Sequence, residues 1–182
     1  LSGRLDLRDQ VVFTIDGADA KDLDDAVSLE KEGGLYRLGV HIADVSHYVR
    51  QGSRLDREAF ARGTSIYYAD KVIPMLPKGL SNGICSLNPQ EDRLAFSVLI
   101  TLSEKGELVN SAFRKTVIRS RVKGVYGEVN ALLAGEGSPA LRAKYREALP
   151  FLPLMKELKD LRLKLRRQRG APELDVTESR IL

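Results

Sequence analysis

The sequence predicts an α+β fold with a largely antiparallel sheet and with helices concentrated in the C-terminal part. Segments rich in β-branched and aromatic residues fill much of the first two thirds of the chain, and two pairs of them are joined by short turns. Leucines at helical spacing, together with residues that start helices, dominate the remainder. Strands followed by helices are typical of an α+β domain.

Two hairpins account for most of the expected sheet. Gly33-Gly34 separates one pair of apolar, alternating segments, and Glu104-Lys105-Gly106 separates another. Strands joined by such short connections pair antiparallel. The segment 64–68 also has strand-like composition. We expect the main strands over residues 10–15, 26–31, 35–44, 94–101 and 107–118.

Capping residues set the expected helix boundaries. Ser53, with Asp56 three residues later, resembles a capping box, and Gly63 can end that helix in a left-handed conformation. Ser138-Pro139 supplies an N-cap and a first helical residue. We expect helices over 53–62, 128–134, from 138 to about 149, and from Pro153 to just before Gly170, and an ordered loop over 80–92. The last helix carries a leucine stripe that we interpret as core, with a face for a partner helix as the alternative. The stripe is formed by Leu154, Leu158, Leu161 and Leu165.

Composition bounds the class of protein. Hydrophobic residues make up 43% and charged residues 30% of the 182, which fits a soluble globular domain. No apolar run approaches the ~20 residues needed to cross a membrane, so we expect no membrane association. Cys85 is the only cysteine, which fits a reducing cytoplasm, and we interpret it as a small buried residue. One cysteine and two histidines give little support to a zinc site.

Charge is distributed unevenly along the chain. Residues 1–113 carry 13 basic and 17 acidic side chains, whereas residues 114–169 carry 15 basic and 5 acidic ones. An acidic cluster followed by a basic half suits a polyanion that is steered to a metal site. The alternative is that the basic residues form solvated helix faces. We favour that alternative for Arg162, Lys164, Arg166 and Arg167.

The stretch 13–26 is the most distinctive part of the sequence. It places five aspartates within ten residues between two apolar segments, with Lys21 as the only countercharge. Crowded carboxylates raise one another's pKa unless a cation neutralises them, and such oxygens suit Mg²⁺ or Mn²⁺. A solvated acidic loop is the simplest alternative, and the EF-hand spacing fails from each possible starting aspartate. We favour a metal-dependent site for a phosphate-containing substrate.

Further motifs accompany the aspartates. In chain order, the motifs are Asp16-Gly17, Asp22-Leu23-Asp24-Asp25-Ala26, His41-Ile42-Ala43-Asp44-Val45-Ser46, Ile73-Pro74-Met75-Leu76-Pro77 and Leu80-Ser81-Asn82-Gly83-Ile84-Cys85-Ser86-Leu87-Asn88-Pro89. In their order and spacing they resemble the catalytic (RNB) domain of the ribonuclease R / ribonuclease II family, and residues 80–89 are more similar to ribonuclease R. The resemblance covers most of residues 10–100.

The resemblance implies a processive 3′→5′ exoribonuclease that binds the 3′ end of single-stranded RNA and releases nucleoside 5′-monophosphates. It implies Mg²⁺, with Mn²⁺ as an alternative, held by Asp16, Asp22 and Asp25. Asp24 matches the aspartate on which the family's chemistry depends most, and Tyr67 matches the tyrosine that stacks on the 3′-terminal nucleotide. Asp19 is not among the four, and we interpret it as a solvated loop residue.

Other polar residues receive simpler interpretations. His41 lies in an apolar strand and is interpreted as a hydrogen-bonded core residue, while His47 lies at a strand end with no required role. Tyr67 and Tyr68 are adjacent, so in a strand they face opposite ways, and we expect one in the core and one as a base platform. Phosphate contact and simple solvation stay open for Arg114, Lys115, Arg119, Arg121 and Lys123.

Parts of the family pattern have no match in these 182 residues. We find neither the later arginine-rich segment nor the flanking OB-fold RNA-binding modules, so we interpret residues 1–182 as a partial catalytic domain that lacks its C-terminal side. We expect this piece to be inactive alone and to self-associate through apolar surface that the second half would cover. A non-catalytic RNA-binding module and a structural Ca²⁺ or scaffold domain are the competing interpretations.

Overall fold

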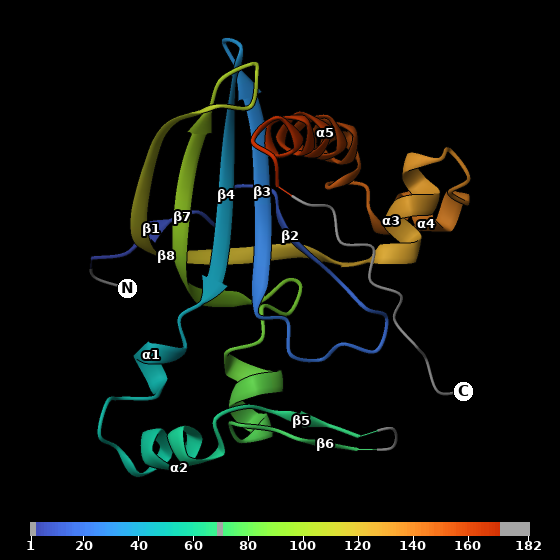
Figure 1. Ribbon diagram of the computed structural model, residues 1–182. Helices are drawn as coiled ribbons and strands as arrows, with labels where there is room; N and C mark the ends of the chain where they lie inside the picture. The colour runs from blue at the N-terminus through green and yellow to red at the C-terminus, as the bar shows by residue number, and fades with distance from the viewer. Residues whose placement is uncertain (1–2, 69–70, 172–182) are drawn as a thin grey trace.

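The computed structural model describes residues 3–68 and 71–171, and its centre is a sheet that closes on itself (Figure 1). The strands hydrogen-bond in the order β1-β8-β2-β3-β4-β7, and β8 also pairs with β7. Because β8 reaches both neighbours, strands β2, β3, β4, β7 and β8 form a barrel-like ring. The strands are β1 (Leu5–Asp6), β2 (Val12–Asp16), β3 (Asp25–Glu32), β4 (Leu35–Ala43), β7 (Asp92–Leu102) and β8 (Leu108–Val125).

The expectation of a largely antiparallel sheet is wrong, because the sheet is mixed. Both predicted hairpins, β3–β4 and β7–β8, pair antiparallel as expected. However, β8 continues to Val125, seven residues beyond the expected end at Ile118. Its extension pairs parallel with β2, from Val12 opposite Ser120 to Asp16 opposite Val125, and its middle pairs parallel with β1. These long-range pairings leave no local sequence signal.

Small and polar side chains fill the inner face of the closed sheet. His41 is fully buried, and its Nδ1 and Nε2 lie 2.8 Å from Ser97 Oγ and 3.0 Å from Ser28 Oγ. Ser97 Oγ in turn lies 2.6 Å from Thr116 Oγ1. A Cβ on Gly39 would lie 2.4 Å from Ser28 Oγ, so glycine makes room for the ladder. His41 is therefore the hydrogen-bonded core residue that the sequence predicted.

Three helices cover one side of the sheet: α3 (Tyr126–Leu133), α4 (Pro139–Lys144) and α5 (Leu152–Gln168). They pack against Phe13 and Val122 through a core that includes Tyr145 and Leu152. Ser138 Oγ accepts a hydrogen bond from Leu141 N, which confirms the predicted cap. Helix α4 ends at Lys144 and not near Leu149, where the sequence predicted its end. Tyr145, which follows it, is fully buried, and a 3₁₀ turn, η2 (Leu149–Phe151), leads into α5.

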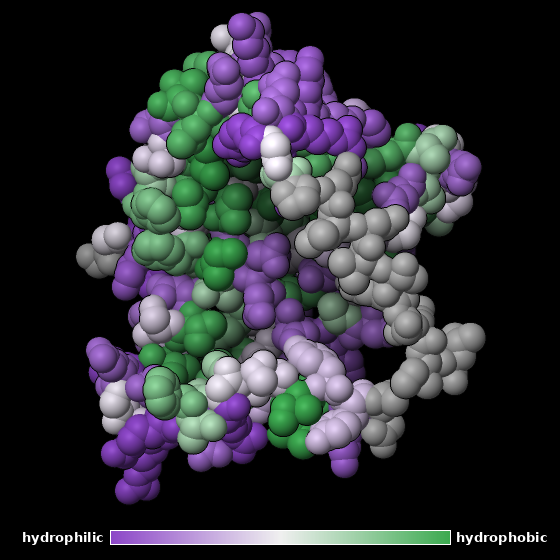
Figure 2. All heavy atoms as spheres, in the orientation of Figure 1, coloured by the Kyte–Doolittle hydropathy of each residue, from purple (hydrophilic) through white to green (hydrophobic). Residues whose placement is uncertain are grey.

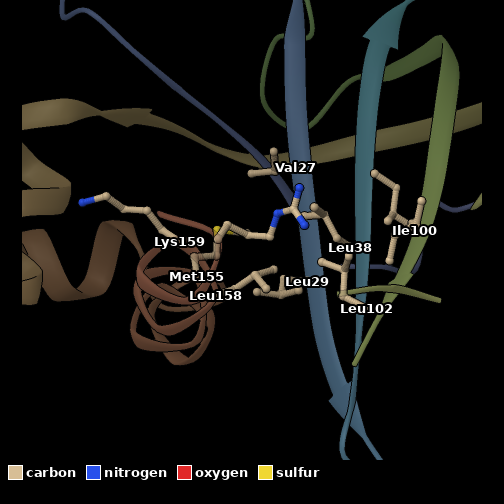
Figure 3. Close-up of a pocket in the computed structure, with 10 residues that line it drawn as sticks. Val27, Leu29, Leu38, Ile100, Leu102, Met155, Leu158 and Lys159 are labelled. Atoms are coloured by element: carbon tan, nitrogen blue, oxygen red, sulfur yellow. The ribbon is translucent and has the colours of Figure 1, made fainter. Parts of the chain in front are cut away.

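The leucine stripe of α5 faces the sheet, which confirms its interpretation as core. Leu158 is buried with Leu29, Tyr36 and Leu102, and Leu154 and Leu161 pack against them. Tyr36 Oη donates to Glu157, and Lys31 Nζ lies 2.8 Å from the same carboxylate. A groove of about 440 Å³ remains open between α5 and strands β3, β4 and β7 (Figure 3).

The helices are not confined to the C-terminal part, because a small layer formed by residues 45–68 and 71–84 lies at one end of the sheet (Figure 1). Ser53 Oγ accepts from Asp56 N, and Gly63 has φ 74°, so the predicted capping residues of α2 are confirmed. The expected loop 80–92 contains a π-helical turn. This layer consists of α1 (Val45–Tyr48), α2 (Arg54–Arg62), β5 (Ile66–Tyr67), β6 (Val72–Ile73) and η1 (Gly79–Ile84).

Apolar side chains also gather on the part of the outer sheet face that α5 leaves uncovered (Figure 2). Phe96 and Phe113, on β7 and β8, stack with their ring centroids 6.0 Å apart and are 42% and 60% exposed. Ile42 on β4 pairs with Phe96 and is also exposed. This patch is separate from the leucine stripe of α5, and self-association of the chain stays a prediction. No described helix is both long and apolar enough to cross a membrane.

Candidate active site

The aspartate stretch forms the connection between β2 and β3. Asp16 is the last residue of β2 and Asp25 is the first of β3, so two carboxylates are fixed by the sheet itself. Between them Leu23 is 1% exposed and packs into the core, which places Asp22 and Asp24 on either side of a buried anchor. Asp19 is exposed, in keeping with its interpretation as a solvated loop residue.

Residues far away in the sequence hold this loop in place. Ser86 Oγ accepts from Leu23 N at 3.0 Å and donates to Lys21 O at 2.8 Å. Arg93 Nε donates to Ser86 O at 2.8 Å, which ties the segment after η1 to β7. Lys123 on β8 donates to the carbonyls of Ala18 and Ala20. Sequence reasoning gave Ser86 no role and left Lys123 undecided, because the contacts of these two residues with the loop span at least 63 residues.

Tyr67 lies beside the aspartates, and its role in stacking on a nucleotide stays a prediction. Its hydroxyl donates to Asp22 Oδ2 at 2.9 Å, and this bond raises the pKa of Tyr67. The ring is 64% exposed and free to meet a ligand. Tyr68 is 53% exposed, so the expectation that one of the two tyrosines lies in the core is wrong. The reason is that the short β5–β6 hairpin forms a sheet of its own.

The predicted carboxylates act on one another electrostatically. Burial, followed by repulsion from Asp22, Asp25 and Asp16, raises the pKa of Asp24. Burial, followed by repulsion from Asp25, also raises the pKa of Asp16, while the nearby Lys123 opposes that rise. The fold therefore brings the four predicted aspartates into one field of negative charge.

The donor set fits a hard divalent cation. One oxygen of Asp16, Oδ2, is buried and has no hydrogen-bond partner, which is costly for a carboxylate. In the described ranges, no three acidic, histidine or cysteine side chains are arranged to hold a metal ion by themselves. Mg²⁺ is usually bound by one or two carboxylates together with water and substrate phosphate, so it needs no complete protein cage. The ligand roles of Asp16, Asp22 and Asp25 stay a prediction.

Two clefts meet at the contact between Asp22 and Tyr67. The larger, of about 930 Å³, is lined by lysines and by Tyr68. The smaller, of about 530 Å³, contains Asp24 and is otherwise mostly apolar or uncharged. Lysines suit a phosphate backbone, and exposed tyrosine rings suit bases. The lysines of the larger cleft are Lys21, Lys71, Lys78 and Lys123.

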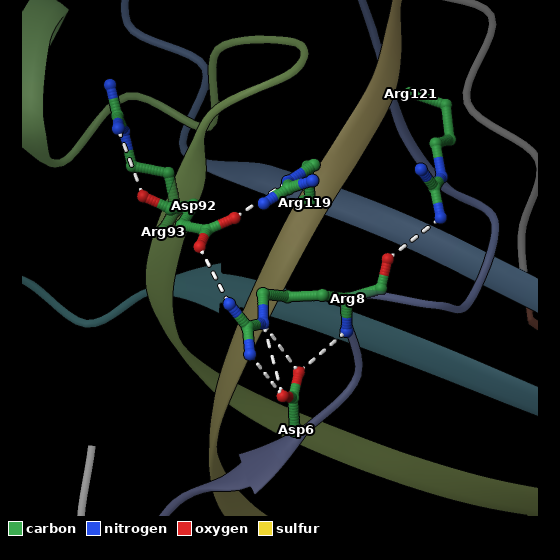
Figure 4. A network of polar contacts seen from close by, with 6 residues as sticks. All are labelled: Asp6, Arg8, Asp92, Arg93, Arg119 and Arg121. Atoms are coloured by element: carbon green, nitrogen blue, oxygen red, sulfur yellow. Dashed lines mark hydrogen bonds and ion pairs between the residues drawn. The ribbon is translucent and has the colours of Figure 1, made fainter.

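Several basic residues of β8 are engaged in structural contacts instead (Figure 4). Arg119 Nε lies 2.7 Å from Asp92 Oδ1, and Arg8 Nη1 lies 3.0 Å from the other oxygen of that carboxylate. Arg121 Nη2 donates to Arg8 O at 2.8 Å. These contacts join β1, β7 and β8, which favours a structural role for Arg119 and Arg121.

Comparison with known proteins places the chain in a family. A family-wide sequence model described as "RNB domain" matches residues 4–182. The chain is 46% identical to ribonuclease R 1 of Lactococcus lactis over 99% of its length, and 51% identical to ribonuclease R of Thermotoga maritima over 94%. The chain belongs to the RNB domain family. It spans only 22% and 24% of those two relatives.

Solved structures agree. RNase R of Mycoplasma genitalium in complex with double-stranded RNA matches with a TM-score of 0.80 at 32% identity, over 92% of this chain and 29% of that one. Yeast Ssd1, described as a pseudonuclease, matches with a TM-score of 0.73 at 21% identity, over 94% of this chain and 20% of that one, which shows the fold alone. The relatives thus identify an exoribonuclease family, and the fold also occurs in a protein described as a pseudonuclease.

Proposed function

We propose that this chain carries the metal-binding and 3′-end-binding part of a processive 3′→5′ exoribonuclease. One observation supports the proposal: Asp22 and Asp24 line the cleft where the Tyr67 hydroxyl bonds to Asp22, and Asp16, Asp22 and Asp25 lie near enough to raise the pKa of Asp24. The ribonuclease R relatives and the RNA-bound M. genitalium neighbour support RNA as the substrate. The products would be nucleoside 5′-monophosphates.

Asp16, Asp22 and Asp25 would hold Mg²⁺, or Mn²⁺ in its place, through their carboxylate oxygens. The bound cation would neutralise phosphoryl charge and lower the pKa of a water molecule. Asp24 is exposed and lines the smaller cleft, so its carboxylate is accessible as a proton acceptor. Asp24 would therefore orient the attacking water and take up its proton.

Tyr67 and the lysines would hold the RNA strand. The exposed ring of Tyr67 would stack on the 3′-terminal base, an interaction of about 1–3 kcal/mol that accepts any base. Lys71 and Lys78, across the larger cleft, would follow the phosphates. These contacts would be made to the RNA backbone and to the faces of the bases, so they would not depend on the RNA sequence. Such binding suits processive degradation.

A labelled-RNA assay on the full-length protein tests this function. We would follow 5′-labelled poly(A) with Mg²⁺, with EDTA, and with Asp24→Asn, which keeps the shape of the side chain and removes its charge. We expect a ladder that EDTA abolishes and that Asp24→Asn slows by about 10²–10⁴-fold, with RNA binding retained. Asp19→Asn, in the same loop, is the matched control and should cleave normally.

The alternative is a non-catalytic RNA-binding module, for which the likeness to a pseudonuclease is the specific observation. It predicts tight RNA binding in a gel shift with no cleavage under any of these conditions. Inactivity of residues 1–182 alone and a location in the cytoplasm stay predictions.

A further inference from the structure

Lys123 lies on β8, and its ammonium group hydrogen-bonds to the aspartate loop. Among the described residues of β8, no other lysine makes such a contact. It lies opposite Thr14 on β2, just before that strand enters the loop. The two strands approach closely here, since a Cβ on Gly124 would lie 2.4 Å from Thr14 O. Lys123 therefore reaches the loop from a rigid neighbouring strand.

The Lys123 ammonium is bound to loop carbonyls rather than to a carboxylate. Nζ donates to Ala18 O at 2.9 Å and to Ala20 O at 2.6 Å, and the side chain is half-buried. These carbonyls lie within a turn that also contains the bond from Ala20 N to Gly17 O. The turn connects Asp16, which is fixed in β2, to Asp22.

We propose that Lys123 is a positioning residue that sets the distance between Asp16 and Asp22, so that both can bind one divalent cation. The proposal rests on the proposed function, because it assigns Lys123 to the metal site of that function. Ser86 fixes the other end of the loop at Lys21 and Leu23, so Lys123 controls the remaining free segment, residues 17–20. Its positive charge also lies near Asp16 without occupying the unpartnered Oδ2.

Direct contact with RNA phosphate is the competing role for Lys123, since it lines the larger cleft. Lys78 offers a matched control. It lines the same cleft from the residue before η1, and substituting it removes one positive charge without touching the contacts of the aspartate loop. The two roles differ in which affinity falls when Lys123 is substituted. If Lys123 positions the loop, the affinity for the cation falls, and if it contacts phosphate, the affinity for RNA falls.

The test uses full-length protein with Lys123→Met, Lys123→Arg and Lys78→Met. Mn²⁺ binding without RNA is measured by calorimetry, RNA binding in EDTA by fluorescence anisotropy, and cleavage by steady-state kinetics. We expect Lys123→Met to weaken Mn²⁺ binding by about 10–100-fold, as for other residues that orient metal ligands. It should lower kcat with little change in KM or in RNA affinity in EDTA. Lys123→Arg, which keeps the donors, should recover most of the Mn²⁺ affinity.

The opposite pattern overturns the proposal. If Lys123→Met behaves like Lys78→Met, with normal Mn²⁺ affinity and weaker RNA binding, Lys123 is a phosphate contact. Failure of the proposed function looks different, because wild-type protein would then neither bind Mn²⁺ nor cleave RNA. In that case hydrogen exchange of the amides of residues 17–22 decides whether Lys123 anchors the loop: unchanged exchange in Lys123→Met would refute it.

Discussion

The barrel interior and the aspartate loop both contain several polar side chains, but the hydrogen bonding of these side chains differs between the two regions. In the interior, Ser28, His41, Ser97 and Thr116 form a continuous hydrogen-bonded ladder in which both ring nitrogens of His41 have partners. At the loop, Asp16 keeps a buried carboxylate oxygen without a partner, and the buried hydroxyl of Thr14 on the same strand also lacks one. Buried polar groups are normally paired, and an unpaired carboxylate is costlier than an unpaired hydroxyl, so Asp16 needs an explanation of its own.

The difference separates structure from function within one small domain. The hydrogen-bonded ladder needs no ligand to complete it, and it fixes the arrangement of four strands. A crowded, unsatisfied set of carboxylates is stable only if something else, here a cation, completes it. The comparison therefore predicts that substitutions in the ladder cost stability, while substitutions in the loop cost activity and can even add stability.

The largest expected effect on stability is that of His41→Leu. This change keeps the approximate volume but leaves Ser28 Oγ without its buried partner, at about 1–3 kcal/mol, and removes one of the two side-chain partners of Ser97, which keeps Thr116. We expect a loss of about 2–4 kcal/mol in the free energy of unfolding, measured by urea denaturation. His47→Leu, at the other histidine, which is exposed, is the control and should change little. An unaffected His41→Leu protein would show that the ladder does not hold the barrel.

A smaller effect comes from pH. Burial lowers the pKa of His41 to about 4, whereas an unfolded histidine titrates near 6.5. Between these values the unfolded state binds a proton that the folded state does not, so stability falls as pH drops from about 6.5 to about 4, by up to about 3 kcal/mol. Urea midpoints at several pH values should show a steeper fall in wild-type protein than in His41→Leu. Equal slopes would mean that His41 is not buried as the neutral form.

Local signals in the sequence predicted the local structure. Ser53 and Ser138 cap helices as expected, and both hairpins form, because their determinants lie within a few residues of one another. The parallel pairing of β8 with β2 was missed, since it joins segments more than a hundred residues apart and depends on how the whole sheet closes.

The candidate site divides in the same way. Five aspartates within ten residues are visible in the sequence. The family resemblance selected four of them and added Tyr67, which the fold brings to Asp22. The supports of the loop were not visible. Nothing in the local sequence distinguishes Ser86 or Lys123 from other serines and lysines. Only the folded barrel brings them into contact with the loop. Tyr68 was misassigned because it lies just after the two-residue strand β5, whose hairpin forms a separate small sheet.

The smallest effect is the sharpest test of the comparison. The raised pKa of Asp16 means that its ionised form destabilises the folded state above its usual titration range, so Asp16→Asn relieves repulsion at neutral pH. In EDTA we expect Asp16→Asn to raise the free energy of unfolding by about 0.5–1 kcal/mol, a size typical of partly exposed charges. With millimolar MgCl₂ the order should reverse, because the bound cation stabilises only the protein that can hold it.

Asp19→Asn is the control for this reversal, since Asp19 is exposed in the same loop and is not one of the four aspartates. Its free energy of unfolding should stay within about 0.5 kcal/mol of wild type in both buffers. A loss of stability for Asp16→Asn in EDTA would mean that this carboxylate is already satisfied by the protein. The loop would then be a structural feature like the His41 ladder, and the contrast between the two regions would fail.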